Sequence, residues 1–115
     1  MRIWLDDIRP MPAGFTHWAR TAAQAIEWLM TGTVEAISFD HDLWPNREFP
    51  NEKEETGYTV AQFIEIGAFQ GDLPPLNWGV HSSNPAGRQN IIAAMLQAEK
   101  FWQGHKWSFE TRKRD

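Results

Sequence analysis

Two stretches decide the fold: Ile3-Trp4-Leu5-Asp6-Asp7 and Ala36-Ile37-Ser38-Phe39-Asp40-His41-Asp42. In each, a short apolar run of the kind that forms a buried strand breaks into carboxylates where the strand should stop. In open α/β sheets, ligands bind at the carboxyl ends of the strands, near the point where strand order reverses. Two such ends side by side would place up to four carboxylates in one crevice.

Carboxylates gathered in this way repel one another unless a cation or another group compensates their charge. A hard divalent ion, Mg²⁺ or Mn²⁺, suits ligands that are all oxygen. The sequence therefore predicts a divalent metal ion held by Asp6, Asp7, Asp40 and Asp42. The alternative is that these residues only end strands and cap helices, as aspartate often does.

The length and composition limit the class of protein. The 115 residues fit one domain. No apolar run approaches the ~20 residues that span a bilayer, and acids as early as Asp6 and Asp7 argue against a signal peptide. The chain has no cysteine, which excludes disulfides and thiolate metal sites. We expect a cytoplasmic protein with no membrane partner.

The net charge of -4 argues against binding to an extended nucleic-acid duplex, which needs a basic face. It leaves room for one nucleotide or an RNA end in a local pocket, so the expected partner is a small phosphorylated ligand or such an end. The sequence does not specify the oligomeric state.

Strands and helices are expected to alternate along the chain. The apolar patterns predict strands at 2–6, 17–20, 34–40 and 76–81, and helices at 22–30, about 56–69 and 85–104. Thr21 fits the N-cap of a helix, because Gln24 follows three residues later as in a capping box. A proline-rich loop at 8–15 replaces the first helix, and 106–110 could add one more strand. Such alternation implies a mainly parallel sheet.

Two segments lie outside this regular pattern. Residues 44–56 are polar and broken by prolines, and a loop this long is usually functional or disordered. Because it directly follows the second acidic cluster, we interpret it as a flexible lid. We expect a single domain that spans residues 1–115. Its last residues, 111–115, are predicted to form a solvated tail.

Three segments should converge at one edge of the sheet: 6–9, 40–42 and 81–84, with the start of the last helix. Their residue types suit phosphate chemistry, because carboxylates hold a metal ion that neutralises phosphoryl oxygens. Arginine grips phosphate with parallel hydrogen bonds, and a helix N-terminus offers N–H groups. The phosphate-binding candidates are Arg9, Ser82, Ser83, Asn84, Arg88 and Asn90.

Histidine titrates near neutral pH, so His41 and His81 can each take or give a proton. With Asp40, they are the catalytic candidates. A histidine at a strand end is often only a hydrogen-bonded structural residue. In the same way, Arg9 could pair with the acids and hold the loop, and Ser83 could simply cap the helix.

The pattern resembles the receiver domain of two-component signalling. There an acidic pair follows the first strand, an aspartate ends the third and a Ser or Thr ends the fourth, as Asp6-Asp7, Asp40 and Ser82 do here. Receivers also carry a lysine at the end of a fifth strand. Nothing here clearly supplies it, since Lys106 stands at the start of the last possible strand and not at its end. Phosphoacceptance at Asp40 is therefore disfavoured.

A closer resemblance is to the cyclic-phosphate processing receiver domains of bacteria and phages. Their motifs are matched by Leu5-Asp6-Asp7-Ile8-Arg9-Pro10, Ser38-Phe39-Asp40-His41-Asp42-Leu43, Thr56-Gly57-Tyr58 and His81-Ser82-Ser83-Asn84-Pro85-Ala86-Gly87-Arg88-Gln89-Asn90. The implied fold is α/β and receiver-like (flavodoxin-like). It is a three-layer sandwich with a mainly parallel sheet of four or five strands, order 2-1-3-4(-5), whose first helix is replaced by a loop.

Three functions follow from these residues. The first is metal-assisted hydrolysis of a phosphate ester, for which the resemblance implies a cyclic phosphate of a nucleotide or RNA end. The second is a module that binds or sequesters such a ligand without cleaving it. The third is a phosphoaccepting response regulator. The sequence does not name the substrate or the metal, nor which of Asp40 and Asp42 faces the site.

Overall fold

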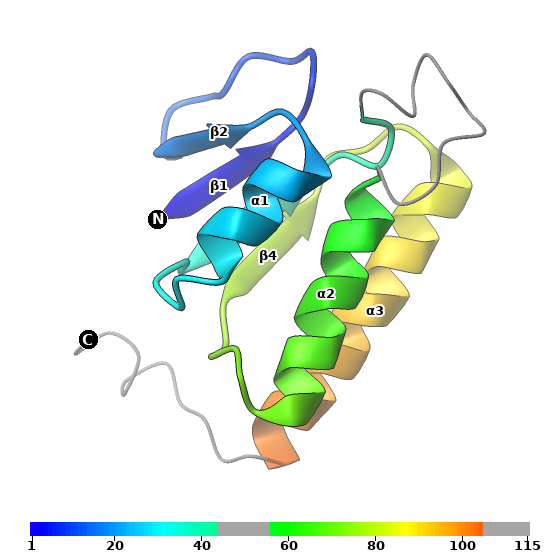
Figure 1. The fold of residues 1–115 in the computed structure, drawn as a ribbon. Coiled ribbons are helices and arrows are strands. Elements are labelled where there is room, and N and C mark those ends of the chain that lie inside the picture. The colour runs from blue at the N-terminus through cyan, green and yellow to red at the C-terminus, as the bar shows by residue number, and fades with distance from the viewer. Residues whose placement is uncertain (44–55, 105–115) are drawn as a thin grey trace.

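The computed structural model describes residues 1–43 and 56–104. Within them, four parallel strands form one sheet in the order β2-β1-β3-β4, with three helices (Figure 1). In chain order the elements are β1 (Arg2–Leu5), β2 (His17–Ala19), α1 (Ala22–Leu29), β3 (Ala36–Phe39), α2 (Gly57–Gln70), β4 (Asn77–Val80) and α3 (Pro85–Gly104).

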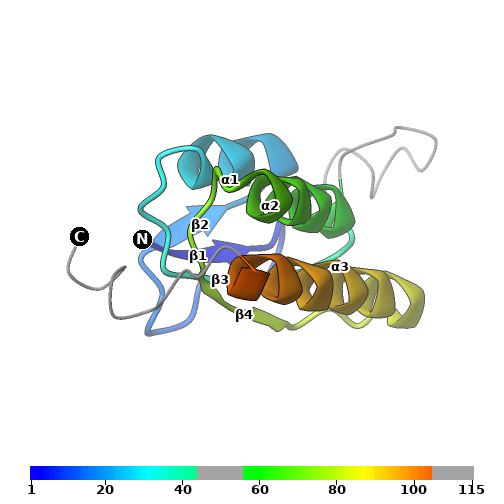
Figure 2. The same cartoon turned by 90° about the horizontal axis from the view of Figure 1, so that it is seen from below.

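The core lies between one face of the sheet and the helices. Side chains alternate along a strand, so Ile3 and Leu5 of β1 share a face with Ile37 and Phe39 of β3, and all four are buried. The buried residues of α1, α2 and α3 belong to the same apolar cluster. All three helices therefore cover one face of the sheet, and Figure 2 views this arrangement from below.

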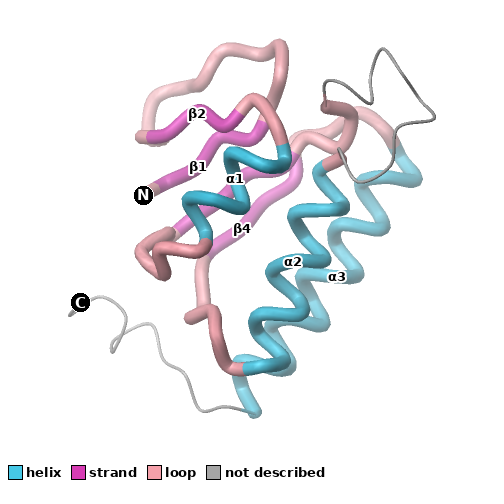
Figure 3. The backbone as a smooth tube through the Cα atoms, in the orientation of Figure 1, coloured by secondary structure: helices cyan, strands magenta, loops and turns pink. Residues whose placement is uncertain are grey.

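The predicted fold class is confirmed: a receiver-like α/β fold with a parallel sheet of order 2-1-3-4. No helix joins β1 to β2, and this connection is the predicted loop (Figure 3). One detail differs from the expected three-layer sandwich, because the described residues form one helical layer. Because a loop replaces the first helix, that helix does not cover the second face of the sheet. The possible strand at 106–110, the lid up to residue 55 and the tail at 111–115 lie outside the described residues.

Side chains cap the helices where the sequence predicts. Thr21 accepts a hydrogen bond from the backbone of Gln24 at the start of α1. Thr56 and Thr59 form a reciprocal capping box at the start of α2, and Gly71 ends that helix in the left-handed conformation. The two threonine caps set where α1 and α2 begin. No helix in the described ranges has the length and apolarity that a membrane span requires.

Candidate metal and phosphate site

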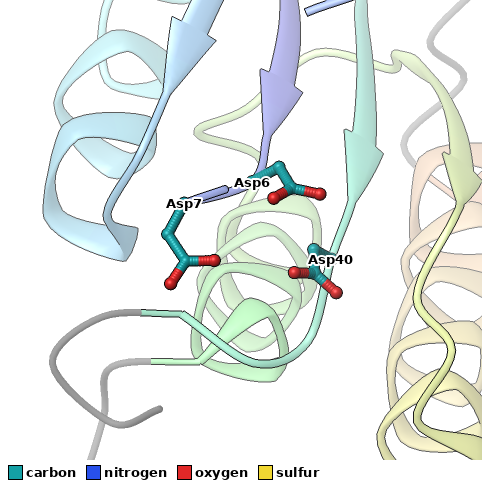
Figure 4. Close-up of side chains that lie close together, drawn as sticks. All are labelled: Asp6, Asp7 and Asp40. Atoms are coloured by element: carbon teal, nitrogen blue, oxygen red, sulfur yellow. The ribbon is translucent and has the colours of Figure 1, made fainter. Parts of the chain in front are cut away.

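Three carboxylates gather where β1 and β3 end. Asp6 and Asp7 follow β1, Asp40 follows β3, and each offers an oxygen that lies within 4.8 Å of the others (Figure 4). Asp6 is 1% exposed and Asp40 is 4% exposed. Because β1 and β3 are neighbouring parallel strands, their carboxyl ends meet at the same edge. This acidic cluster could hold a metal ion. Of the two aspartates in the second stretch, Asp40 is the one that lies in the cluster.

The carboxylate of Asp6 also organises the loop after β1. Its Oδ1 accepts hydrogen bonds of 2.8 Å from the backbone N–H groups of Ile8 and Arg9. Its Oδ2 lies 3.0 Å from Nε2 of His81, and a carboxylate can only accept, so this ring nitrogen donates. The indole N–H of Trp18 donates to the backbone oxygen of Asp6. Asp6 is thus fixed by groups from three segments of the chain.

Both ring nitrogens of His81 have partners. Since Nε2 carries a proton toward Asp6, Nδ1 of the neutral ring accepts from the hydroxyl of Ser38, 2.8 Å away. The ring stacks on the indole of Trp4 with centroids 3.8 Å apart and planes 8° from parallel. Burial lowers the pKa of His81, against the opposing effect of the Asp6 carboxylate. A neutral ring adds no positive charge to the acidic cluster, and this fits a site built to hold a cation.

We expect the metal-free protein to lose stability at this histidine as the pH falls. Because the pKa of His81 is below 6.5 in the folded protein, the unfolded chain binds a proton at a pH where the folded protein does not. The contribution of His81 to the free energy of unfolding is therefore complete above pH ~6.5. It is lost as the pH falls from there through the pKa of His81 in the folded protein. Urea unfolding in EDTA over a pH series checks this. His81→Gln should flatten the slope, and an unchanged slope would contradict the assignment.

Both candidate arginines reach the carboxyl end of β4. Arg9 donates to the backbone oxygen of His81 at 2.9 Å, and Arg88 donates to that of Val80 at 2.6 Å. The indole N–H of Trp4 in turn donates to the backbone oxygen of Arg9. Arg9 therefore helps to hold the loop through the backbone oxygen of His81, and its pairing with the acids stays a prediction. Each exposed guanidinium has five N–H donors, so phosphate binding stays a prediction for both.

The third member of the second acidic stretch has different partners. Asp42 Oδ1 lies 2.9 Å from Nδ1 of His41, and the amide of Asn84 donates to both Asp42 oxygens at 3.2 and 3.4 Å. Asn84 Oδ1 accepts from the backbone N–H of Gly87 and so caps α3. Asp42 is not part of the group formed by the other three aspartates. Its role as a metal ligand stays a prediction.

The remaining candidates lie around the start of α3. Ser82 is buried, and its hydroxyl accepts from the backbone N–H of Asn84. Ser83 is exposed before the helix, and Asn90 is exposed within α3. Asn84, which caps α3, contacts Asp42. The phosphate-binding roles of Ser82, Ser83 and Asn90 stay predictions.

A family model described as the cyclic-phosphate processing receiver domain matches residues 1–97. The chain belongs to this family. The resemblance read from the motifs is therefore confirmed, and it covers all four strands, α1, α2 and most of α3. No curated protein and no solved structure matches the chain.

Sequence reasoning gave no site role to two residues of this receiver-like domain. Trp4 and Ser38 are register partners on neighbouring strands, and together they hold the ring of His81. Alternation along a strand was the available signal. Each lies two residues before a site aspartate, Asp6 or Asp40, but both strands end one residue before that aspartate, so alternation gives only a partial signal.

Proposed function

We propose that this receiver-like domain binds a divalent metal ion, Mg²⁺ or Mn²⁺, and uses it to bind and hydrolyse a phosphate ester. The ligand class is a cyclic phosphate of a nucleotide or of an RNA end, which the family name supports. One observation carries the proposal: the oxygens of Asp6, Asp7 and Asp40 lie within 4.8 Å of one another, with Asp6 and Asp40 almost fully buried. All-oxygen donors fit these ions.

A metal ion held there would offset negative charge on the phosphoryl oxygens. The chain itself supplies the remaining phosphate contacts. Arg9 and Arg88 lie at the carboxyl end of β4 with exposed guanidinium groups, and α3 begins at the same edge. In its first turn Pro85 has no N–H and the N–H of Gly87 is bonded to Asn84, so Ala86 is the residue whose N–H this turn could offer to an anion.

Hydrolysis needs one proton to leave the attacking water and one to reach the departing oxygen. The water oxygen forms a bond to phosphorus, the bond from phosphorus to one ribose oxygen breaks, and that oxygen gains a proton. Both histidines are candidates for this proton transfer. The contacts favour His41, because both ring nitrogens of His81 are engaged by Asp6 and Ser38.

The test is a turnover screen with purified protein. It uses 2′,3′- and 3′,5′-cyclic nucleotides in Mg²⁺, in Mn²⁺ and in EDTA. We expect a linear nucleotide product with metal and none in EDTA. If the folded protein yields no product from any of these compounds with either metal, the hydrolytic function is contradicted.

A binding module is the second candidate. The engagement of both nitrogens of His81 favours it, since this leaves fewer groups for proton transfer. Calorimetry distinguishes the two functions: saturable binding of a cyclic nucleotide with metal, without product, would favour the module.

A phosphoaccepting regulator has less support. Among residues 1–43 and 56–104 the one lysine is Lys100, near the end of α3 away from the site. Labelling of Asp40 by a small phosphodonor would revive this function.

A further inference from the structure

Asp42 holds the side chain of His41, and Asn84 holds the carboxylate of Asp42. The carboxylate oxygen of Asp42 lies 2.9 Å from Nδ1 of His41, and because a carboxylate accepts, Nδ1 carries the proton. The amide of Asn84 donates to the same carboxylate. Asn84 Nδ2 and His41 Nδ1 lie 3.5 Å apart. Both are donors, and they lie close together because they share the Asp42 carboxylate as acceptor.

The backbone of His41 is fixed separately from its ring. Its N–H donates to Oδ1 of Asp40 at 2.9 Å, and its backbone oxygen accepts from the N–H of Gly57 at 2.8 Å. The main chain at His41 is therefore tied to one aspartate of the acidic cluster, while the ring is tied to Asp42. The ring position thus depends on Asp42 and not on the metal ligands alone.

The first turn of α3 supplies the surface on which the ring lies. A Cβ added at Gly87 would overlap the ring atoms of His41, so the imidazole packs directly on the backbone of this turn. Asn84 closes the arrangement by accepting from the N–H of Gly87. The imidazole of His41, whose side chain is 18% exposed, is thereby set beside the helix N-terminus that the proposed phosphate would face.

Asp42 differs from Asp6 and Asp40 in exposure and in partners. Its side chain is 39% exposed, whereas Asp6 and Asp40 are 1% and 4% exposed. A carboxylate bonded to one imidazole nitrogen fixes the tautomer and turns the other nitrogen outward. Within the part of the chain that the structure describes, Nε2 of His41 has no hydrogen-bond partner.

We infer that Asp42 is a positioning residue rather than a metal ligand. With Asn84, it holds His41 in the tautomer with the proton on Nδ1 and presents Nε2 to the phosphate ligand. This inference rests on the proposed function for what His41 then does, but the geometry of the ring is testable without turnover.

The first experiment uses the wild-type protein in EDTA at a pH where the imidazole is neutral. Long-range ¹H–¹⁵N correlation spectra identify which nitrogen of each histidine ring carries the proton. We expect the Nδ1–H form for His41 and the Nε2–H form for His81. The Nε2–H form at His41 would overturn the inference, whatever the turnover screen gives.

The second experiment compares Asp42→Asn with Asp40→Asn, and with Asp72→Asn as an exposed control away from the site. Mn²⁺ titration should give wild-type affinity for Asp42→Asn and Asp72→Asn and a large loss for Asp40→Asn. The His41 ring of Asp42→Asn should lose its single Nδ1–H tautomer, because an amide can present either its oxygen or its NH₂ group to the ring. A loss of Mn²⁺ affinity equal to that of Asp40→Asn would make Asp42 a ligand and overturn the inference.

A third variant tests the contact between the His41 ring and the first turn of α3. Gly87→Ala should displace the His41 imidazole and leave Mn²⁺ affinity unchanged, while Gly104→Ala, which meets no atom within 4 Å, serves as its control. If wild type turns over 2′,3′-cyclic nucleotides, Asp42→Asn and Gly87→Ala should lower kcat at least ~10-fold with little change in KM. Unchanged kcat in both would overturn the inference. If wild type shows no turnover, the proposed hydrolysis fails, and the tautomer and Mn²⁺ results alone decide the placement of Asp42.

Discussion

Asparagine at position 40 is expected to abolish both the stabilisation of this domain by Mg²⁺ and any metal-dependent turnover. Asp40→Asn keeps an oxygen that can accept from the N–H of His41 but removes one of three clustered charges. Loss of a group that merely supports a metal ligand costs 10- to 100-fold in affinity. Loss of a ligand should therefore cost at least ~100-fold.

Thermal unfolding measures this effect directly. A metal that binds the folded state alone stabilises it by an amount that grows with concentration, about 2.7 kcal/mol at one hundred times Kd. The wild type should show a rise in Tm with Mg²⁺, and Asp40→Asn should show none at the same concentration. In EDTA the variant should be at least as stable as the wild type, because repulsion among the carboxylates is reduced. A full Mg²⁺ response in the variant would remove Asp40 from the site.

The second large effect is expected at Gly57, where α2 begins. A Cβ at this position would overlap the backbone oxygen of Asp40, and the N–H of Gly57 donates to the backbone oxygen of His41. Neither backbone can move without displacing the end of β3. We expect Gly57→Ala to destabilise the protein by about 2–3 kcal/mol, as overpacking of a rigid core does.

Urea unfolding checks the result, with Gly79→Ala as the matched control. Gly79 lies in β4 and an added Cβ there would meet no atom within 4 Å, so this control should stay near wild-type stability. If Gly57→Ala were as stable as the control, the close approach of α2 to Asp40 would be wrong. If it were destabilised, its Mg²⁺ response should also weaken, because the same backbone positions Asp40.

The fold was predictable because the decisive signals are local and repeat along the chain. Short apolar runs that end in acids locate β1 and β3, and the threonine caps and glycines locate α1 and α2. The meeting of Asp6 with Asp40 then follows from parallel pairing alone. The number of helical layers was not predictable in this way, since it depends on what crosses the open face of the sheet and not on any strand or helix pattern.

Side-chain partners were harder to predict than positions. Nothing in the spacing of Asp40, His41 and Asp42 tells which carboxylate faces the metal site, because β3 ends at Phe39 and the alternation of side chains ends with it. The separation of Asp42 from the cluster depends on Asn84, which is distant in sequence. Similarly, the two histidines look alike in sequence, and only the stack on Trp4 and the contact with Ser38 distinguish His81.

The central claim is that Asp6, Asp7 and Asp40 form one divalent metal site, and Mn²⁺ titration followed by amide NMR tests it most directly. Paramagnetic Mn²⁺ broadens the signals of nuclei close to it. We expect saturable broadening centred on residues 6–9 and 40–42, reversed by EDTA and absent in Asp40→Asn. Broadening that does not saturate, or that centres on other acidic residues while these signals stay sharp, would contradict the account.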